Sequence, residues 1–358
     1  MQIHNFSAGP SILPAEVFQE ASKAVIDFKE TGLSLLEMSH RSKEFDSVLN
    51  EAVQLVAELL HLPENYKSIF LSGGASTQFA LVPMNLLNPD KKAAYINTGT
   101  WSDKAIKEAQ AFGKVDTIAS SKESNYTFIP KNYQVSEDAS YLHITTNNTV
   151  FGTQFRTIPA TAVPIVADMS SDIFSYELNI DKFGLIYAGA QKNMGPAGTT
   201  LVIIREDMLG KAKRHIPSMF DYSIHIKKNS AYNTPPVFPI YVSMLNLRWI
   251  KKNGGIKAME ARSIARSELI YGEIDQNPLF KGTTATEDRS RMNATFVLND
   301  EYRSLENEFL ETCKNSGISG IKGHRSVGGF RASMYNAMEL ESVQVLVDVM
   351  KDFENRKG

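Results

Sequence analysis

The residue best suited to chemistry follows a short apolar segment in the middle of the chain. Lys192 lies in LIYAGAQKNMGPAG, where small residues precede the lysine and Gly195-Pro196 form a turn. Burial disfavours the charged form of a lysine and lowers its pKa, and the neutral amine attacks carbonyl carbons. A lysine in a surface loop is the usual alternative. The apolar segments on both sides of Lys192 favour a buried, reactive amine.

A second candidate is Asp168, which ends the apolar segment VPIVAD. An aspartate at the carboxyl end of a buried strand lies where open α/β sheets bind their ligands. A buried carboxylate is costly unless a cation or several hydrogen-bond donors face it. Asp168 therefore either faces a positive group of a ligand or caps the turn that follows, and the residue types leave both interpretations open.

Other segments have compositions that suit anion binding. FLSGGASTQFALV predicts a strand, a glycine turn and a helix start, which can bind a phosphate, although the motif alone favours a plain tight turn with Ser72 or Ser76 capping the helix. Trp101 precedes a helix start and could be a stacking platform or a core residue. Arginine side chains outside long helices suit carboxylates and phosphates, or a solvated surface. They occur in the pairs His40-Arg41 and His324-Arg325 and at Arg331.

Composition excludes several classes of protein. The 358 residues carry 38 Lys and Arg against 40 Asp and Glu, a net charge of -2, which argues against a nucleic-acid-binding surface. The single cysteine, Cys313, ends a predicted helix and is expected to be a half-buried thiol; no metal site is expected. The N-terminal segment does not resemble a signal peptide, and no apolar run approaches the roughly 20 residues of a membrane span. We therefore expect a cytoplasmic protein without membrane partners.

The apolar periodicity predicts an α/β protein. Helices are expected over 16–30, 43–61, 102–112 and 206–214. Apolar runs predict strands over 68–72, 93–97, 141–145, 163–168, 185–188 and 200–204. Because these strands are apolar on both faces, they indicate a mixed, mostly parallel sheet sandwiched by helices.

The pattern changes near residue 254 and indicates a small α+β domain. Its expected elements are a helix over 255–276, the strand MNATFVLN, a helix over 301–315, an extended glycine-rich stretch over 317–334 and a helix over 339–354. Before it, the proline-containing segment 227–240 is expected to be irregular and functional. We expect a large cofactor-binding domain of residues 15–252 and a small domain of residues 1–14 and 253–358.

In order along the chain, several segments resemble the phosphoserine aminotransferases. They are NFSAGPSILP, SHRSKEF, GGASTQF, NTGTW, AGAQKNMGPAG, NTPP and KGHRSVGGFRASMYNA. The resemblance covers residue 3 to the C-terminus. It implies a fold type I, class V pyridoxal 5'-phosphate enzyme that forms a homodimer with shared active sites. The implied reaction is reversible amino transfer from L-glutamate to 3-phosphohydroxypyruvate in serine biosynthesis, and use of a 4-phosphorylated keto acid of pyridoxine synthesis is left open.

The resemblance also implies a role for each candidate residue. Lys192 matches the lysine that carries the cofactor, and Asp168 matches the carboxylate that pairs with the pyridine nitrogen. The other implied cofactor contacts are Trp101 on the ring, Thr149 near the ring hydroxyl, and, at the phosphate, Gln191, the amides of Ala75 and Ser76, and Asn233 and Thr234 from the partner subunit. The implied substrate contacts are Arg331 for the α-carboxylate and His40, Arg41, His324 and Arg325 for the distal anion.

One departure and two alternatives accompany this interpretation. Some members of the family have an arginine at the position of Ser76, so phosphate contacts are expected to differ here. A broader aminotransferase or a cysteine desulfurase would keep Lys192 and Asp168, but a desulfurase needs a cysteine in a mobile loop and Cys313 is predicted to be helical. A non-catalytic anion-binding protein would leave Lys192 without a role. Visible absorption that glutamate bleaches would separate enzyme from binding protein.

Overall fold

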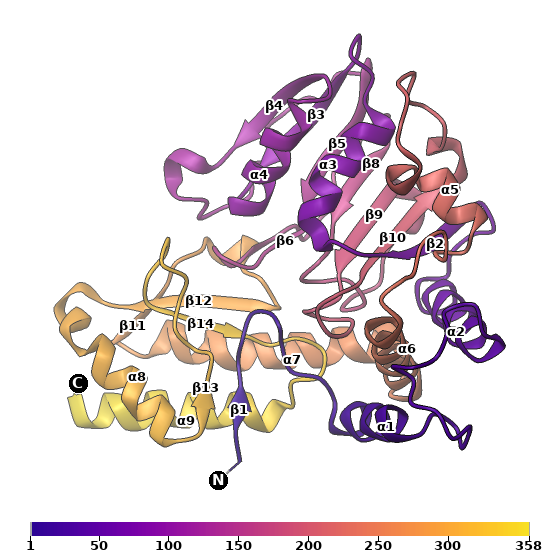
Figure 1. The fold of residues 1–358 in the computed structure, drawn as a ribbon. Coiled ribbons are helices and arrows are strands. Elements are labelled where there is room, and N and C mark those ends of the chain that lie inside the picture. Colours follow the sequence, from indigo (N-terminus) through magenta and orange to yellow (C-terminus); the bar gives the residue numbers. More distant parts are fainter. Residues whose placement is uncertain (1, 358) are drawn as a thin grey trace.

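The computed structural model describes residues 2–357 and contains a large sheet with a smaller sheet beside it (Figure 1). The large sheet has the strand order β2-β10-β9-β8-β5-β3-β4. Its strands are β2 (Tyr66–Leu71), β3 (Lys92–Asn97), β4 (Lys114–Ser120), β5 (Ala139–Thr145), β8 (Ile165–Asp168), β9 (Phe183–Gly189) and β10 (Thr200–Arg205). β10 is antiparallel to both neighbours, and the other adjacent pairs are parallel. The mixed, mostly parallel sheet expected from the sequence is confirmed.

The strand directions bring several strand ends to one edge of this sheet. β3, β5, β8 and β9 are parallel, and β2 runs the same way because β10 is antiparallel to both β2 and β9. The last residues of these five strands are Leu71, Asn97, Thr145, Asp168 and Gly189. The carboxyl edge of such a sheet is where α/β proteins bind ligands.

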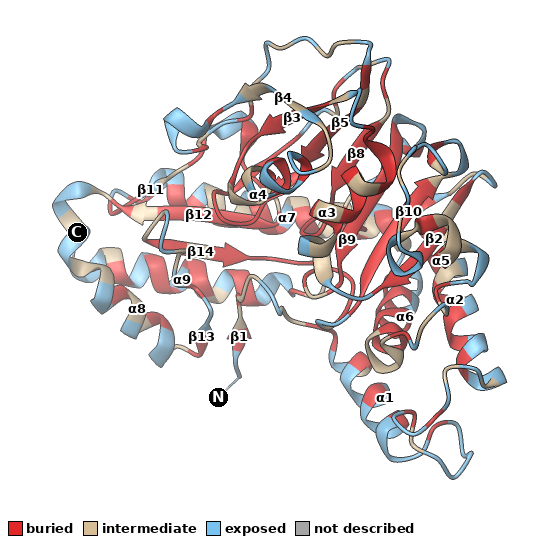
Figure 2. Ribbon diagram, turned by 45° about the horizontal axis from the view of Figure 1, so that its top comes forward, coloured by how far each residue is buried: buried red, intermediate tan, exposed pale blue. Residues whose placement is uncertain are grey.

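Helices cover both faces of the large sheet, so most of its strands are buried on both sides (Figure 2). On β10, Leu201 and Ile203 face one core and Val202 and Ile204 face the other, as the two-residue period of a strand requires. The first core is shared with α1 (Ala15–Ile26), α2 (Lys43–Leu60) and α6 (Val237–Lys252). The second is shared with α3 (Gly74–Leu86), α4 (Thr100–Ala109) and α5 (Tyr222–Lys227).

The C-terminal part has its own sheet and core. The antiparallel strands β11 (Phe280–Gly282), β12 (Asn293–Leu298) and β14 (Phe330–Ser333) pack with α7 (Gly255–Gln276), α8 (Glu306–Asn315) and α9 (Leu340–Lys357). β1 (His4–Asn5) pairs with β13 (Ile318–Ser319), and Phe6 is buried in the same core. The first residues of the chain thus pack with its last hundred residues, while the domain boundaries at residues 15 and 253 stay a prediction.

Three expected helices differ clearly in the structure. The segment expected to be one helix over 301–315 is the 3-10 helix Asp300–Leu305 followed by α8. The helix expected over 206–214 is only the 3-10 turn Glu206–Met208, and Gly210 then has a positive φ of 66°, which a right-handed helix cannot contain. The helix expected over 16–30 ends at Ile26. No helix among the described residues is long and apolar enough to cross a membrane.

Several elements are absent from the sequence-based expectation, and two of them have a clear physical reason. β4 is an edge strand with mostly exposed side chains, so it lacks the apolar run that marks the other strands. α6 begins inside the segment that was expected to be irregular. Its Pro239 does not prevent this, because it lies in the first turn of the helix, where a missing backbone N–H costs no helical hydrogen bond. The connection between α5 and α6 is therefore shorter than expected.

Candidate active site

Lys192 follows the carboxyl end of β9, and neighbouring residues enclose its amine. Lys192 is 9% exposed, and its Nζ donates a hydrogen bond to Oγ1 of Thr149 (2.8 Å). Gly9 packs against the lysine stem: it has a φ of 141°, and a Cβ there would lie 3.3 Å from Lys192 Cγ. Burial lowers the pKa of Lys192 to about 8, although the nearby charge of Asp168 acts in the opposite direction. At neutral pH the neutral amine is therefore far more populated than in an exposed lysine.

Asp168 is the last residue of β8 and is buried beside this lysine. Its Oδ1 accepts a hydrogen bond from the amide of Ser170 (2.9 Å). Burial raises the pKa of Asp168, and the charge of Lys192 together with hydrogen bonds from Ser170 opposes that rise. A buried carboxylate with so few donors suits a cationic partner.

A second buried carboxyl group lies one turn further on, at Asp172. Thr146 Oγ1 donates to its Oδ1 (2.6 Å), and Gln154 Nε2 donates to its Oδ2 (3.2 Å). Burial, which the hydrogen bonds from Thr146 and Gln154 oppose and the charge of Asp168 reinforces, raises the pKa of Asp172 to about 7. Asp172 was not a sequence-based candidate. The only feature of the sequence that could have identified Asp172 is its position in the turn that follows the apolar segment VPIVAD.

Thr149, Trp101 and Arg331 converge on the same amine. Arg331, on β14, donates from Nη1 to the backbone oxygen of Thr149 (3.2 Å). The ring centroid of Trp101 lies 5.7 Å from Lys192 Nζ. Trp101 Nε1 and Arg331 Nε are buried without a hydrogen-bond partner in the described part of the chain. The structure thus brings four candidate residues from distant segments into one site with unused hydrogen-bond donors.

The glycine turn lies at the carboxyl end of β2. Gly73 has a φ of 99° and precedes α3, whose first turn contains Ala75 and the exposed Ser76. Ala75 and Trp101 pack against the same core. Backbone amides in such a first turn are available to an anion.

The remaining cofactor candidates lie around this turn and the lysine. Gln191 precedes Lys192, and its backbone oxygen accepts a hydrogen bond from the Ser11 amide (3.0 Å). Asn233 lines a cavity of about 180 Å³ together with Gly73 of its own chain, and Thr234 is exposed beside it. Asn233 is therefore near the glycine turn of its own chain, and its contribution to a partner's site stays a prediction.

The two His-Arg pairs lie in different places. His324 and Arg325 are in the loop before β14, where Nδ1 of His324 accepts a hydrogen bond from the Ser326 amide (3.2 Å). Burial lowers the pKa of His324, and the neighbouring charge of Arg331 lowers it further. His40 and Arg41 lie before α2 and, within residues 2–357, make no hydrogen bond or ion pair with another candidate residue. One chain therefore brings only the second pair to the site.

A buried polar network connects the two sheets and was missed from the sequence. Asn147 Nδ2 donates to Ser171 Oγ (2.8 Å) and to Asn293 Oδ1 (2.7 Å). Asn293 Nδ2 in turn donates to Ser333 Oγ (2.9 Å), two residues after Arg331. The loop after Asp168 is thereby fixed relative to the strand that carries the arginine.

The described residues contain no group of His, Cys, Asp or Glu side chains that could hold a metal ion. Cys313 is fully buried instead of half-buried, and burial raises the pKa of its thiol to about 12. Such a thiol is a poor nucleophile, which disfavours a desulfurase. The arrangement around Lys192 suits reaction of a neutral amine with a carbonyl carbon beside a carboxylate-binding arginine.

Comparison with known proteins identifies the family of this chain. The class-V aminotransferase model matches residues 3–346. The phosphoserine aminotransferase of Flavobacterium psychrophilum is 59% identical over 357 residues, covering 99% of this chain and all of the relative. That of Bacteroides fragilis is 56% identical over 354 residues, covering 99% of both chains.

Solved structures show the same similarity. The phosphoserine aminotransferase of Bacillus circulans subsp. alkalophilus superimposes with a TM-score of 0.96 at 45% identity, covering 100% of this chain and 99% of that one. The pyridoxal-phosphate-bound enzyme of Trichomonas vaginalis superimposes with a TM-score of 0.93 at 38% identity, covering 98% of this chain and all of that one. The protein belongs to the class-V aminotransferase family.

Proposed function

We propose that this protein is a phosphoserine aminotransferase, which transfers the amino group of L-glutamate to 3-phosphohydroxypyruvate and produces O-phospho-L-serine and 2-oxoglutarate. The observation that carries the proposal is the buried amine of Lys192 beside Thr149, with Arg331 bonded to the backbone of that threonine. Relatives named phosphoserine aminotransferase, at 53 to 59% identity over nearly the whole chain, support the same reaction.

The residues of the site fit pyridoxal 5'-phosphate as its cofactor. Asp168 suits a protonated pyridine nitrogen because it is a buried carboxylate with few donors, and Trp101 offers an aromatic face. The first turn of α3 and Gln191 suit the phosphate, and Lys192 suits the aldehyde. When bound, the cofactor supplies the electron sink that makes the substrate's Cα proton acidic.

The protein's own residues then bind, orient and move protons. Arg331 holds the α-carboxylate, because its guanidinium forms a fork that matches a carboxylate and its Nε has no other partner among the described residues. Lys192, with its pKa lowered to about 8, can accept and return a proton at Cα near neutral pH. Enclosure of the amine by Gly9 and Thr149 limits the access of water.

The distal anion of both substrates needs a second positive region. A γ-carboxylate and a phosphate monoester are both distal anions, so one cationic pocket can accept them in turn. His324 and Arg325 lie close enough to Arg331 for its charge to lower the pKa of His324. We assign these two residues, with His40 and Arg41 of a second chain, to that pocket.

The test of the function is an assay of the purified holoenzyme with glutamate and a panel of keto acids. We expect 3-phosphohydroxypyruvate to be the preferred acceptor, with phosphoserine identified by mass spectrometry and bleaching of the cofactor's visible absorption by glutamate. Pyruvate and oxaloacetate are the control acceptors. Faster turnover of either control would contradict the proposal and indicate a broader aminotransferase.

A homodimer with shared sites is part of the proposal. Large apolar side chains are exposed next to the residues that one chain leaves unused: Leu36 is 62% exposed before His40, and Tyr232 is 38% exposed beside Asn233. Exposed apolar groups of this kind favour burial against another molecule. A second copy of the chain would cover them and complete the site.

Coexpression of two inactive variants tests the sharing. Lys192→Ala and Asn233→Asp chains are each expected to give inactive homodimers, because one lacks the amine and the other places a negative charge beside the cofactor phosphate. Mixed dimers should regain activity, since one of their two sites combines an intact Lys192 with an intact Asn233 from the other chain. Inactive mixed dimers, purified with two different tags, would mean that Asn233 serves its own chain.

A further inference from the structure

Lys104, in the first half of α4, lies beside Trp101 and has no role in the site so far. Its Nζ is 4.7 Å from the ring centroid of Trp101, and Lys192 Nζ is 5.7 Å from the same centroid. The two amines are therefore no farther apart than the sum of these distances. We propose that Lys104 binds the distal phosphate of the substrate and increases the enzyme's preference for a phosphate dianion over a carboxylate. This inference rests on the function proposed above.

The amine of Lys104 is free to bind an anion. Among the described residues Lys104 forms no ion pair, although Asp103 is adjacent to it in sequence. The carboxylate of Asp103 is already bound by Lys107 (2.9 Å) and by Lys122 (3.1 Å). The ammonium group of Lys104, an exposed residue, lies over the Trp101 ring, and a phosphate can readily replace that cation–π attraction.

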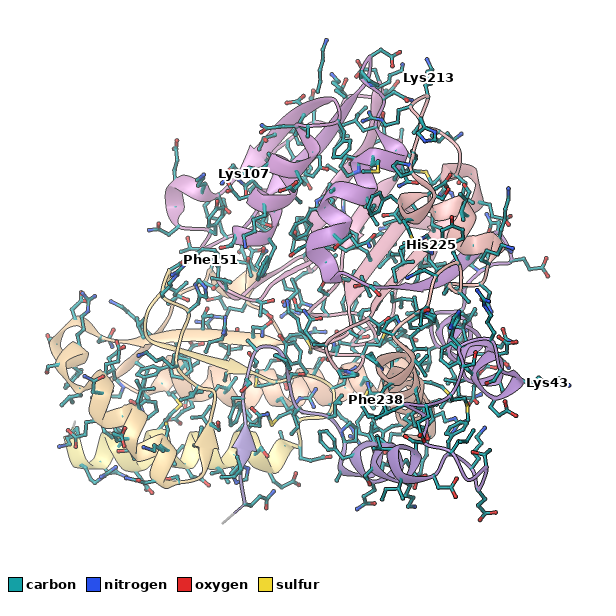
Figure 3. The ribbon with its side chains drawn as sticks, viewed as in Figure 1. Lys43, Lys107, Phe151, Lys213, His225 and Phe238 are labelled. Carbon is teal, nitrogen blue, oxygen red and sulfur yellow. The ribbon has the colours of Figure 1, made fainter. Side chains whose placement is uncertain are left out.

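The surroundings of Lys104 are cationic. The loop that carries His324 docks on the large-sheet side of the molecule, because Val327 packs against Tyr126 and Phe151 (Figure 3 labels Phe151 below Lys107 of α4). Lys104 is one of three cations whose positive charge lowers the pKa of His324, and the others are Arg325 and Arg331. Within the described part of the chain, no anionic side chain shifts the pKa of His324.

A group of positive charges without a counter-charge attracts the ligand with the larger negative charge. A phosphate monoester carries close to two negative charges at neutral pH, whereas a γ-carboxylate carries one. Each added cation therefore favours the phosphate by more than the carboxylate. The flexible four-carbon stem of a lysine lets Lys104 follow the anion after the rest of the substrate has bound.

The test compares Lys104→Gln, Lys104→Arg and the control Lys107→Gln on the holoenzyme. Lys107 lies one turn further along α4 and is paired with Asp103. Its substitution should therefore leave kcat/KM unchanged for both phosphoserine and glutamate. Lys104→Gln should lower kcat/KM for phosphoserine about tenfold, as expected for one charge-assisted hydrogen bond, and for glutamate about threefold or less. The value of kcat/KM for alanine should not change in Lys104→Gln. Lys104→Arg, which keeps the positive charge, should retain most of the activity with phosphoserine. Calorimetric titration with inorganic phosphate should show a similar loss of affinity in Lys104→Gln alone.

Three results would overturn the inference. An equal loss with phosphoserine, glutamate and alanine would mean that Lys104 acts only by positioning Trp101. Unchanged kinetics and phosphate affinity in Lys104→Gln would remove it from the site. Equal effects of Lys104→Gln and Lys107→Gln would indicate a general charge effect. If the unmodified enzyme does not use phosphoserine, the proposed function fails instead, and the phosphate titration alone decides the part played by Lys104.

Discussion

Lys192→Ala is expected to abolish turnover and leave the protein folded. In the proposed function, the substitution removes both the amine assigned to hold the cofactor and the group assigned to move the Cα proton. Loss of general acid–base catalysis alone corresponds to roughly a 10²- to 10⁴-fold lower rate. Because the amine is buried with a lowered pKa, its removal also relieves a desolvation cost, so the fold should persist. The measurement is the multiple-turnover rate with glutamate and 3-phosphohydroxypyruvate, together with the thermal midpoint of unfolding.

Lys182→Ala is the matched control, because Lys182 is exposed just before β9, the strand that leads to Lys192. It should behave like the unmodified enzyme. Added methylamine should partly restore the rate in Lys192→Ala and have no effect on the control, because only the former lacks an amine at the reaction centre. A multiple-turnover rate near normal in Lys192→Ala would disprove the assignment of the lysine.

The sequence predicted the large sheet well because most of its strands are buried on both faces. A strand such as β10 shows this as a continuous apolar run, which needs no knowledge of its neighbours. The exposed edge strand β4 gives no such run. Helix α6 was missed for a related reason, since the prolines around Val237 suppress the helical pattern where the helix begins.

Candidate residues close to strand ends could also be found from the sequence. Asp168 and Lys192 each follow an apolar strand, and parallel strands bring such positions to one edge. The structure adds contacts between residues distant in sequence. Arg331 reaches Thr149 across 182 positions, and Asn147 reaches Asn293 across 146. No local pattern encodes those pairings, so the buried network between the sheets could not be predicted.

The placement of His40 and Arg41 shows another limit. Their resemblance to substrate-binding residues is clear in sequence, yet a single chain leaves them without contact to the rest of the site. Residues proposed to act across a subunit interface can be placed in a site only when the second chain is present. The mixed-dimer experiment tests that placement at the NTPP segment.

Asp168→Asn should weaken cofactor binding and lower activity by a large factor. An amide cannot balance the positive charge of a protonated pyridine nitrogen, and removing one partner of a buried charge pair typically costs about 3–5 kcal/mol. That corresponds to roughly a 10²- to 5 × 10³-fold higher dissociation constant for pyridoxal 5'-phosphate, measured by equilibrium dialysis. Asp168 also raises the pKa of Lys192, so the pKa of the amine should fall below about 8 in the cofactor-free variant.

Asp172→Asn separates this specific role from a general effect of buried charge. Asp172 is equally buried and accepts hydrogen bonds from Thr146 and Gln154, but its pKa of about 7 means that the carboxyl group is partly protonated at neutral pH. Replacing it with a neutral amide therefore removes less charge, and we expect cofactor affinity to change by less than about tenfold. Equal losses of cofactor affinity in the two variants would mean that the total charge of Asp168 and Asp172 matters, and not a specific contact of Asp168. An unchanged cofactor affinity and spectrum in Asp168→Asn would show that its carboxylate does not pair with the pyridine nitrogen.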